Sequence, residues 1–222
     1  MNMNVVLIPS IINTPNLPLS YSDVRSVFTR KERFIQLQKT IESVKKKIPN
    51  NYIVVVECTD LNKEETEYLS FNIDLLVNVY KNEEAREIIY SPSKSYGEGT
   101  MTLLGLKSLL RRKIEWKNLF KITGRYWLGE EFNFEKYNNS HNVIKCIDDD
   151  KKNLYTCFYK LNKIAVVRWY YYLTKQDEEF KKNTNFEIIF GKFIDKIHEN
   201  KRFINRLGIL GNVATSGELV QG

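Results

Sequence analysis

The sequence predicts an α/β protein with a mixed, mainly parallel β-sheet flanked by helices. Strand and helix signals alternate through about the first 130 residues, which is the pattern of such a sheet. Residues 52–56 read Tyr-Ile-Val-Val-Val, a nearly continuous β-branched run that is typical of a strand buried on both faces. Apolar residues recur at steps of three and four between Phe34 and Ile48, and this spacing gives a helix one apolar stripe.

The first half of the chain divides into expected strands with helices between them. The strands cover 5–12, 52–56, 73–80 and a stretch that carries Lys121-Ile122-Thr123. Helices are expected at 34–48, before Pro49, at about 63–70, and in a segment opened by Gly97-Glu98-Gly99-Thr100. Residues 13–27, which are polar and contain prolines, and residues 81–96 are expected to be loops.

The second half differs in character. Residues 142–147 and 154–159 predict two strands, paired as a hairpin across the acidic turn Asp148-Asp149-Asp150. Helices are expected at 164–180, with aromatic rings that should pack in the core, and at 186–198, before a glycine-rich end at 207–217. We find no internal repeat and no clear linker, so we expect residues 1–222 to form a single domain.

Composition narrows the function classes. The net charge of +7 favours anionic partners such as nucleotides, nucleic acid or a membrane surface. The basic residues are dispersed in short clusters, mostly at predicted helix ends, and no nucleic-acid-binding motif is present. We therefore expect no nucleic-acid partner and keep a basic nucleic-acid-binding protein as the alternative.

No apolar run approaches the roughly 20 residues of a membrane span. The three cysteines form no disulfide framework, which favours a cytoplasmic location.

Several catalytic chemistries lack their residues. His141 and His198 are far apart in the sequence and have no partners at metal-ligand spacing. The sequence also shows no pattern typical of a Ser-His-Asp or related catalytic triad. The chain has neither a G-x-x-x-x-G-K-[ST] phosphate loop nor a G-x-G-x-x-G pattern after its first strand. Kinase, P-loop NTPase and dinucleotide oxidoreductase functions therefore lose support.

The most informative stretch is Thr123-Gly124-Arg125, where an apolar strand runs into a turn before an aromatic pair. Glycine lets the backbone come close to a ligand, and arginine carries a planar, permanently charged fork suited to phosphate. This combination predicts an anionic substrate at the carboxyl edge of the sheet. The competing interpretation is a turn whose arginine is solvated.

Polar residues stand at the carboxyl ends of the other expected strands as well. They are Ser10 and Asn13 after the first strand, Glu57 after the second, and Asn78 near the end of the third. In a parallel sheet these positions converge on one crevice. Each residue alone is equally well explained as part of a turn.

Gly97-Glu98-Gly99-Thr100 suggests a second way to bind an anion. Glycines at a helix start leave backbone N–H groups uncovered, so we expect Gly97 to lie at the site, with Lys94 in reach of a phosphate. The alternative is an ordinary helix N-terminus with Thr100 near the cap.

Four segments together resemble a known family. They are Arg33-x-x-Gln36-x-x-x-Thr40-Ile41, Val56-Glu57, Tyr96-Gly97-Glu98-Gly99 and Phe120-Lys121-Ile122-Thr123-Gly124-Arg125-Tyr126. The series is similar to small GT-A-type nucleotide-sugar glycosyltransferases, in particular to the N-terminal domains of chlorella-virus enzymes that glycosylate the major capsid protein. The resemblance covers nearly the whole chain, including residues 211–217.

The resemblance implies a GT-A fold with a nucleotide sugar, expected to be a UDP-sugar, across the carboxyl edge of the sheet. Residues of about 1–130 would form a nucleotide-binding half and those of about 131–222 an acceptor-side half. The segment from Ser10 to Asn13 would pack by the base and ribose, Glu57 would touch the nucleoside, and Arg33 and Lys94 would approach the nucleotide from the side. The acceptor would be a glycan or glycoprotein, and a viral protein of this kind would act in the host cytoplasm.

The chain departs from the family at its metal motif. Family members often use manganese, and typical GT-A enzymes carry Asp-x-Asp where this chain has Thr123-Gly124-Arg125. Either Arg125 replaces the charge of Mn²⁺ on the diphosphate, or other oxygens hold the ion. The sequence names no metal ligand.

Glycosyl transfer builds negative charge on the departing diphosphate, so cations beside it should supply much of the catalysis. Arg125 is the first candidate and Lys94 the second. An inverting reaction also needs a base for the acceptor hydroxyl, and Glu187 matches where similar enzymes place it. Glu187 is equally well explained as a favourable acid at a helix N-terminus. Residues 148–150 are alternative bases, and a retaining reaction needs none.

A nucleotidyltransferase is a third hypothesis, because that chemistry uses a similar α/β scaffold. It needs a loop rich in glycine and lysine directly after the first strand. Residues 10–18 contain prolines and asparagines instead, so the sequence favours this hypothesis least.

Overall fold

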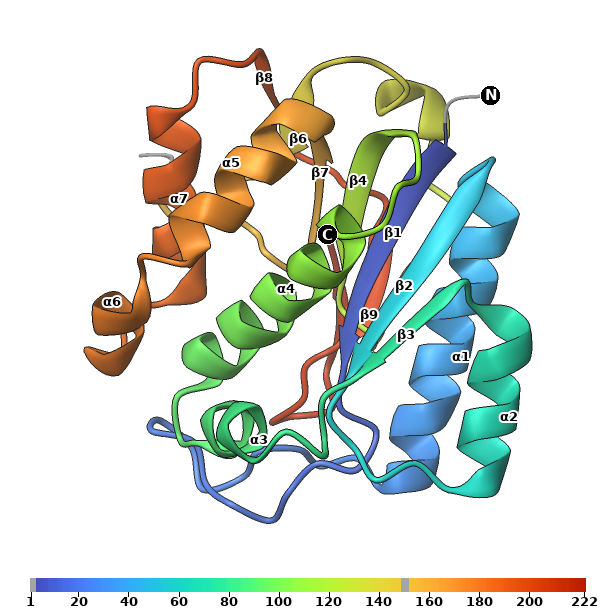
Figure 1. The fold of residues 1–222 in the computed structure, drawn as a ribbon, viewed down its shortest axis with the longest axis vertical. Coiled ribbons are helices and arrows are strands. Elements are labelled where there is room, and N and C mark those ends of the chain that lie inside the picture. The colour runs from blue at the N-terminus through green and yellow to red at the C-terminus, as the bar shows by residue number, and fades with distance from the viewer. Residues whose placement is uncertain (1–2, 149–151) are drawn as a thin grey trace.

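The computed structural model describes residues 3–148 and 152–222, and its centre is a mixed seven-stranded sheet (Figure 1). The strand order is β3-β2-β1-β4-β7-β6-β8. The parallel part contains β1 (Met3–Ser10), β2 (Asn51–Glu57), β3 (Leu75–Asn78) and β4 (Trp116–Ile122). Antiparallel pairing adds β7 (Phe158–Asn162) to β4 and β6 (Asn142–Ile144) to β7, and β8 (Lys201–Phe203) runs parallel to β6. The expected α/β fold class is confirmed.

Helices cover both faces of the sheet (Figure 1). One face carries α1 (Arg30–Lys47) and α2 (Lys63–Asn72). The other carries α3 (Glu83–Tyr90), α4 (Lys94–Leu110), α5 (Lys163–Leu173) and α7 (Phe186–Lys196), with the short α6 (Asp177–Lys181) beside α4. A short 3₁₀ helix, η1 (Phe134–Lys136), follows β5 (Tyr126–Leu128).

The central strands bury side chains in two separate hydrophobic cores, one on each face of the sheet, as their sequence predicts. Side chains alternate across a strand, so Val5 and Leu7 of β1 lie in the core under α4 and α5, while Val6 and Ile8 lie in the core under α1. All four side chains are fully buried. The same alternation in β2 explains why its β-branched run lacks polar residues.

A small second sheet brings the C-terminal segment back to the end of β4. It has the order β10-β9-β5 and contains β5 (Tyr126–Leu128), β9 (Ile209–Asn212) and β10 (Leu219–Gln221). Gly211 makes this approach possible, because a Cβ there would stand 2.0 Å from a ring atom of Tyr126. The glycine-rich end is therefore structured, and it lies next to Thr123-Gly124-Arg125.

Residues 81–96 do not form the expected loop. Asn82 caps α3 by accepting a hydrogen bond from the Ala85 N–H (3.1 Å), and Ser93 caps α4. The helix thus begins at Lys94, so the prediction that Gly97-Glu98-Gly99-Thr100 opens it, with Thr100 near the cap, is wrong. The sequence pattern misled because glycine is rarer inside helices than at their ends.

Other boundaries also differ from the expectations. The predicted helix at 164–180 divides into α5 and α6. The hairpin of 142–147 and 154–159 is present, with pairing between Val143 and Lys160 and a bridge between Cys146 and Leu154. Of the acidic turn, Asp149 and Asp150 lie outside the described residues. No helix in the described part is long and apolar enough to cross a membrane.

Candidate functional site

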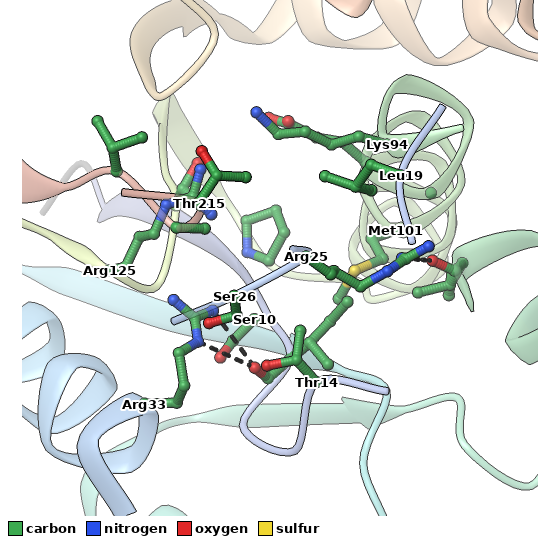
Figure 2. Close-up of a pocket in the computed structure, with 18 of the residues that line it drawn as sticks. Ser10, Thr14, Leu19, Arg25, Ser26, Arg33, Lys94, Met101, Arg125 and Thr215 are labelled. Atoms are coloured by element: carbon green, nitrogen blue, oxygen red, sulfur yellow. Dashed lines mark hydrogen bonds between the residues drawn. The ribbon is translucent and has the colours of Figure 1, made fainter. Parts of the chain in front are cut away.

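A cavity of about 400 Å³ opens where β1 and β4 end (Figure 2). Its floor includes Ser10 and Thr123 from the ends of these strands, and α4 forms one wall. Residues from the 13–27 segment and residues 213–215 line the remainder. This is the carboxyl edge of the parallel strands, where the sequence predicts a site.

The cavity gathers part of the predicted site. Six of the predicted residues line it: Ser10, Arg33, Lys94, Gly97, Thr123 and Arg125. Four others do not line it: Asn13, Glu57, Asn78 and Gly124. Glu187 lines a second cavity next to the first.

Two arginines supply positive charge from one side of the first cavity. Arg33 is only 5% exposed, and its Nε and Nη2 both donate to the carbonyl oxygen of Ile11 at 3.3 Å, which holds the guanidinium against the end of β1. Burial and the neighbouring charge of Arg125 lower the pKa of Arg33 to about 9. Two cations that repel each other at a cavity wall create a strong local preference for an anion.

An unpaired polar atom also marks this wall. The buried Arg125 Nε has no hydrogen-bond partner among the described residues. Buried polar groups are normally bonded, so this guanidinium is suited to a bound ligand. Figure 2 shows Arg33, Arg125 and Lys94 reaching toward the same space from α1, from the turn after β4 and from α4.

Gly124 acts through packing. Its N–H donates to the carbonyl oxygen of Pro9 (2.9 Å), and a Cβ at this position would stand 2.9 Å from the Ser10 Cβ and 3.2 Å from the Leu37 Cδ1. Glycine therefore lets the end of β4 lie against the end of β1. Gly124 places Ser10 and Arg125 side by side, and it does not line the cavity.

Gly97 likewise packs rather than offering an open N–H. Its N–H donates to the Ser93 carbonyl oxygen (3.1 Å) within α4. A Cβ would stand 2.9 Å from the Ile89 carbonyl oxygen at the end of α3. Gly97 still lines the cavity, but its backbone donor is occupied.

The sequence analysis missed a buried ion pair beside the cavity. Glu98, one turn after Lys94, pairs with Lys121, which stands one residue before the carboxyl end of β4. The Lys121 ammonium also donates to Thr123 Oγ1 (3.0 Å) and to the carbonyl oxygen of Thr156. Burial alone raises the pKa of Glu98, but the charges of Lys121, Lys94 and Arg125 outweigh it, so this pKa lies below its usual value. A lysine between Phe120 and Ile122 was the sequence signal for a buried charge that needs a partner, although the sequence does not identify that partner.

Glu57, Asn13 and Asn78 shape the loops at the edge of the sheet. Glu57 is fully buried, and its Oε1 accepts hydrogen bonds from the N–H groups of Ile12 and Cys58, both at 3.0 Å. Burial raises the pKa of Glu57 to about 7. Asn13 donates its backbone N–H to Thr59 Oγ1 (3.0 Å), and Asn78 Nδ2 donates to the Thr59 carbonyl oxygen (3.1 Å).

The segment between β1 and α1 crosses the cavity and is tied down by Arg25, another residue that the sequence analysis missed. The guanidinium of Arg25 donates to the carbonyl oxygens of Leu17 (3.1 Å), Ile89 (3.3 Å) and Tyr90 (2.9 Å). Figure 2 shows this side chain turned toward the right, where the carbonyls at the end of α3 lie. Its charge is thus committed to the protein, unlike that of Arg125.

The second cavity also measures about 400 Å³ and adjoins the first, because Tyr21, Lys94 and Glu98 line both. Its other lining residues are mostly hydroxyl and amide side chains: Ser20, Ser93, Ser95, Asn183, Asn185 and Glu187. Glu187 lies in the first turn of α7, and its Oε1 accepts a hydrogen bond from Thr156 Oγ1 (3.1 Å). A cationic cavity therefore joins a polar, nearly neutral one.

Comparison with known proteins identifies the fold. No protein family and no curated protein matches the chain by sequence. Among solved structures, 4-diphosphocytidyl-2C-methyl-D-erythritol synthase from Anaerococcus prevotii DSM 20548 superimposes with a TM-score of 0.51 at 13% identity, over 98% of this chain and 90% of that one. The nucleoside-diphosphate-sugar pyrophosphorylase from Vibrio cholerae RC9 gives a TM-score of 0.54 at 8% identity, over 94% and 95%. The chain shares the fold of these proteins.

The donor set at this site does not fit a protein-held manganese ion. No group of three or more His, Cys, Asp or Glu residues gathers anywhere in ranges 3–148 and 152–222. Glu98 is the one acid in the described lining of the first cavity, and it is paired with the Lys121 ammonium. Hard divalent cations prefer several oxygen ligands, whereas this wall presents Arg33, Arg125 and Lys94.

Proposed function

We propose that the chain is a glycosyltransferase that moves a sugar from a nucleotide-sugar donor, a UDP-sugar, to a glycan or glycoprotein acceptor. The observation that carries the proposal is the pair Arg33 and Arg125, which line one cavity at the carboxyl edge of the sheet and lie close enough for the charge of Arg125 to lower the pKa of Arg33. A diphosphate matches this charge and accepts bidentate hydrogen bonds from guanidinium groups.

The fold comparison and the sequence resemblance support the proposal in different ways. One structural neighbour is a pyrophosphorylase of nucleoside-diphosphate sugars, so the scaffold is compatible with a donor of this class. The resemblance to GT-A-type glycosyltransferases alone supports five further parts of the proposal. They are the preference for uridine, glycosyl transfer as the reaction, a viral origin, glycosylation of a capsid protein and a location in the host cytoplasm.

The mechanism follows from the two adjoining cavities. The donor's diphosphate lies in the cationic cavity, and its sugar points toward the polar one. As the bond from the anomeric carbon to the β-phosphate oxygen breaks, negative charge grows on the diphosphate, and Arg125 and Lys94 stabilise it. In an inverting reaction, Glu187 takes the proton from the acceptor hydroxyl, and Thr156 orients its carboxylate. A retaining reaction leaves Glu187 with acceptor binding only.

A nucleotidyltransferase is the second candidate, and the likeness to both structural neighbours favours it. The two reactions break different bonds. Glycosyl transfer releases UDP, whereas a nucleotidyltransferase joins a sugar phosphate to a nucleotide and releases pyrophosphate. The segment after β1 reads Ser-Ile-Ile-Asn-Thr-Pro-Asn-Leu-Pro at 10–18 and lacks the glycines and lysines that would cradle a triphosphate.

Calorimetry with UDP, in EDTA and in Mn²⁺, tests the nucleotide site. We expect binding in both buffers, and no heat at millimolar UDP contradicts the proposal.

Incubation with a panel of UDP-sugars then separates the glycosyltransferase from the nucleotidyltransferase. Release of UDP, with product anomers read by NMR, supports glycosyl transfer. Formation of UTP from UDP-sugar and pyrophosphate supports the nucleotidyltransferase.

A further inference from the structure

Glu98 occupies the wall between the two cavities. It lines both of them, and within the described lining of the cationic cavity it is the one acid. On one side lie Arg33 and Arg125, which the proposed function assigns to the diphosphate. On the other side lies Glu187. A donor whose diphosphate lies by the two arginines and whose sugar points toward Glu187 therefore brings that sugar near Glu98.

The carboxylate of Glu98 is held rigidly from behind. Its side chain is 15% exposed, whereas that of Lys121 is 0% exposed. Three oxygens bind the Lys121 ammonium: Glu98 Oε1, Thr123 Oγ1 and the Thr156 carbonyl. These three contacts fix the ammonium behind the wall, and it holds Glu98 Oε1 there.

One oxygen of Glu98 is left for a ligand. Oε1 accepts from Lys121, and no other group in the described residues donates to this carboxylate. A buried ion pair adds little stability compared with well-packed apolar side chains. The pair is better explained as a device that keeps a charged carboxylate at the wall.

The chemistry of this position selects the ligand group. A carboxylate repels a diphosphate but accepts short, charge-assisted hydrogen bonds from hydroxyl groups. We infer that Glu98 binds hydroxyl groups of the sugar carried by the donor, and that Lys121 is its positioning residue. This inference rests on the proposed function, because it assumes that a nucleotide sugar occupies the cationic cavity.

The test compares the binding of UDP alone with the binding of intact UDP-sugars. Dissociation constants are measured by calorimetry for UDP, UDP-glucose, UDP-galactose and UDP-xylose in the wild type and in Glu98→Gln, Glu98→Asp and Lys121→Met. We expect each variant to bind UDP at least as tightly as the wild type. The tightest-binding UDP-sugar should bind about 10- to 100-fold more weakly, the usual effect of losing hydrogen bonds to a charged group.

Glu42→Gln, an exposed acid on α1, serves as the matched control and should leave both affinities unchanged. Glu98→Asp keeps the charge opposite Lys121 and retracts the carboxylate by one methylene, so it gives a folded variant even where Glu98→Gln fails to fold. A loss for the UDP-sugar alone supports the inference. Equal losses for UDP and UDP-sugar, or no loss at all, overturn it and leave the nucleotide site standing. A wild type that binds no UDP overturns the proposed function instead.

Discussion

Among the single residues of the cationic cavity, Arg33 keeps its charge although burial and the neighbouring Arg125 lower its pKa. With a pKa of about 9, Arg33 remains protonated near pH 7. This residue therefore keeps its preference for an anion at neutral pH.

Replacing Arg125 by Ala should weaken UDP binding by about 10- to 100-fold, because hydrogen bonds to a charged group contribute about 1.5–3 kcal/mol. Calorimetry measures the affinity, and circular dichroism checks the fold. Arg206→Ala is the matched control, since this arginine is exposed and far along the chain. Unchanged UDP affinity in Arg125→Ala would remove Arg125 from the site.

Replacing Gly124 by Ala should lower the free energy of unfolding by about 1–3 kcal/mol, the usual effect of overpacking. The new Cβ would stand 2.9 Å from the Ser10 Cβ. Adding Ser10→Gly removes this contact, so the double variant should lose less than the sum of the two single losses. Strict additivity in urea unfolding would show that the two positions do not touch.

At the element scale, Glu57 joins the end of β2 to the loop after β1 through the Ile12 N–H. Its pKa rises from 4.5 in the unfolded chain to about 7 in the fold because the side chain is buried. The folded state therefore binds the extra proton between these pH values. Glu57 thus favours folding below pH 4.5, and this contribution disappears as the pH rises to about 7.

The free energy of unfolding of the wild type should therefore decrease as the pH rises from 4.5 to 7. This decrease should exceed that of Glu57→Gln by on the order of 3 kcal/mol. Glutamine keeps the oxygen that accepts from the Ile12 N–H and has no proton to lose. Urea unfolding of both proteins across this range checks the difference. Parallel pH profiles would mean that Glu57 does not titrate in the window.

Elements with a strong apolar pattern were predictable, and elements defined by caps were not. The run at 52–56 and the stripe from Phe34 to Ile48 were confirmed as β2 and α1. Burial on both faces leaves an unbroken apolar run, and burial on one face of a helix leaves a clear period. The helix α3 was missed because its start depends on one side chain, Asn82, bonding to a backbone N–H. The same local chemistry moved the start of α4 to Lys94.

Site residues were predictable only where their place at the end of a strand in the sequence fixes their place at the edge of the sheet. Ser10, Thr123 and Arg125 follow parallel strands, so their convergence could be predicted. Glu98 and Lys121 meet across 23 positions of the chain, and residues 213–215 arrive through the β5–β9 pairing. Contacts of this kind depend on packing between distant segments, which one sequence does not encode in any local pattern.

At the scale of the whole molecule, the charge of +7 is spread over separate elements. Lys45, Lys46 and Lys47 form the last turn of α1, where cations complement the helix dipole. Lys181 pairs with Asp177 and Glu178 at the end of α6.

These clusters do not build one basic groove, so single-stranded RNA should bind weakly and lose that binding at physiological salt. Fluorescence anisotropy measures it, and tight binding that persists in salt would revive the nucleic-acid alternative.

The charge of the cavity also predicts how the protein responds to chelators. Since Arg33, Arg125 and Lys94 already supply positive charge at this cavity, we expect EDTA to leave UDP affinity unchanged and added Mn²⁺ not to increase it. Titration in matched buffers checks this expectation. A large gain with Mn²⁺ would show that oxygens outside the described acids, or those of the nucleotide itself, recruit the ion.

The small sheet of β5, β9 and β10 brings the segment at 213–215 to the cavity. Ala214 and Thr215 line the cavity, and the Ala214 carbonyl accepts the Val27 N–H (2.9 Å) from the segment that crosses it. Residues about 190 positions apart along the chain thus meet at a single rim. A variant that lacks residues 213–222 should therefore leave this cavity open on one side, whereas Arg33 and Arg125 are still present in its sequence.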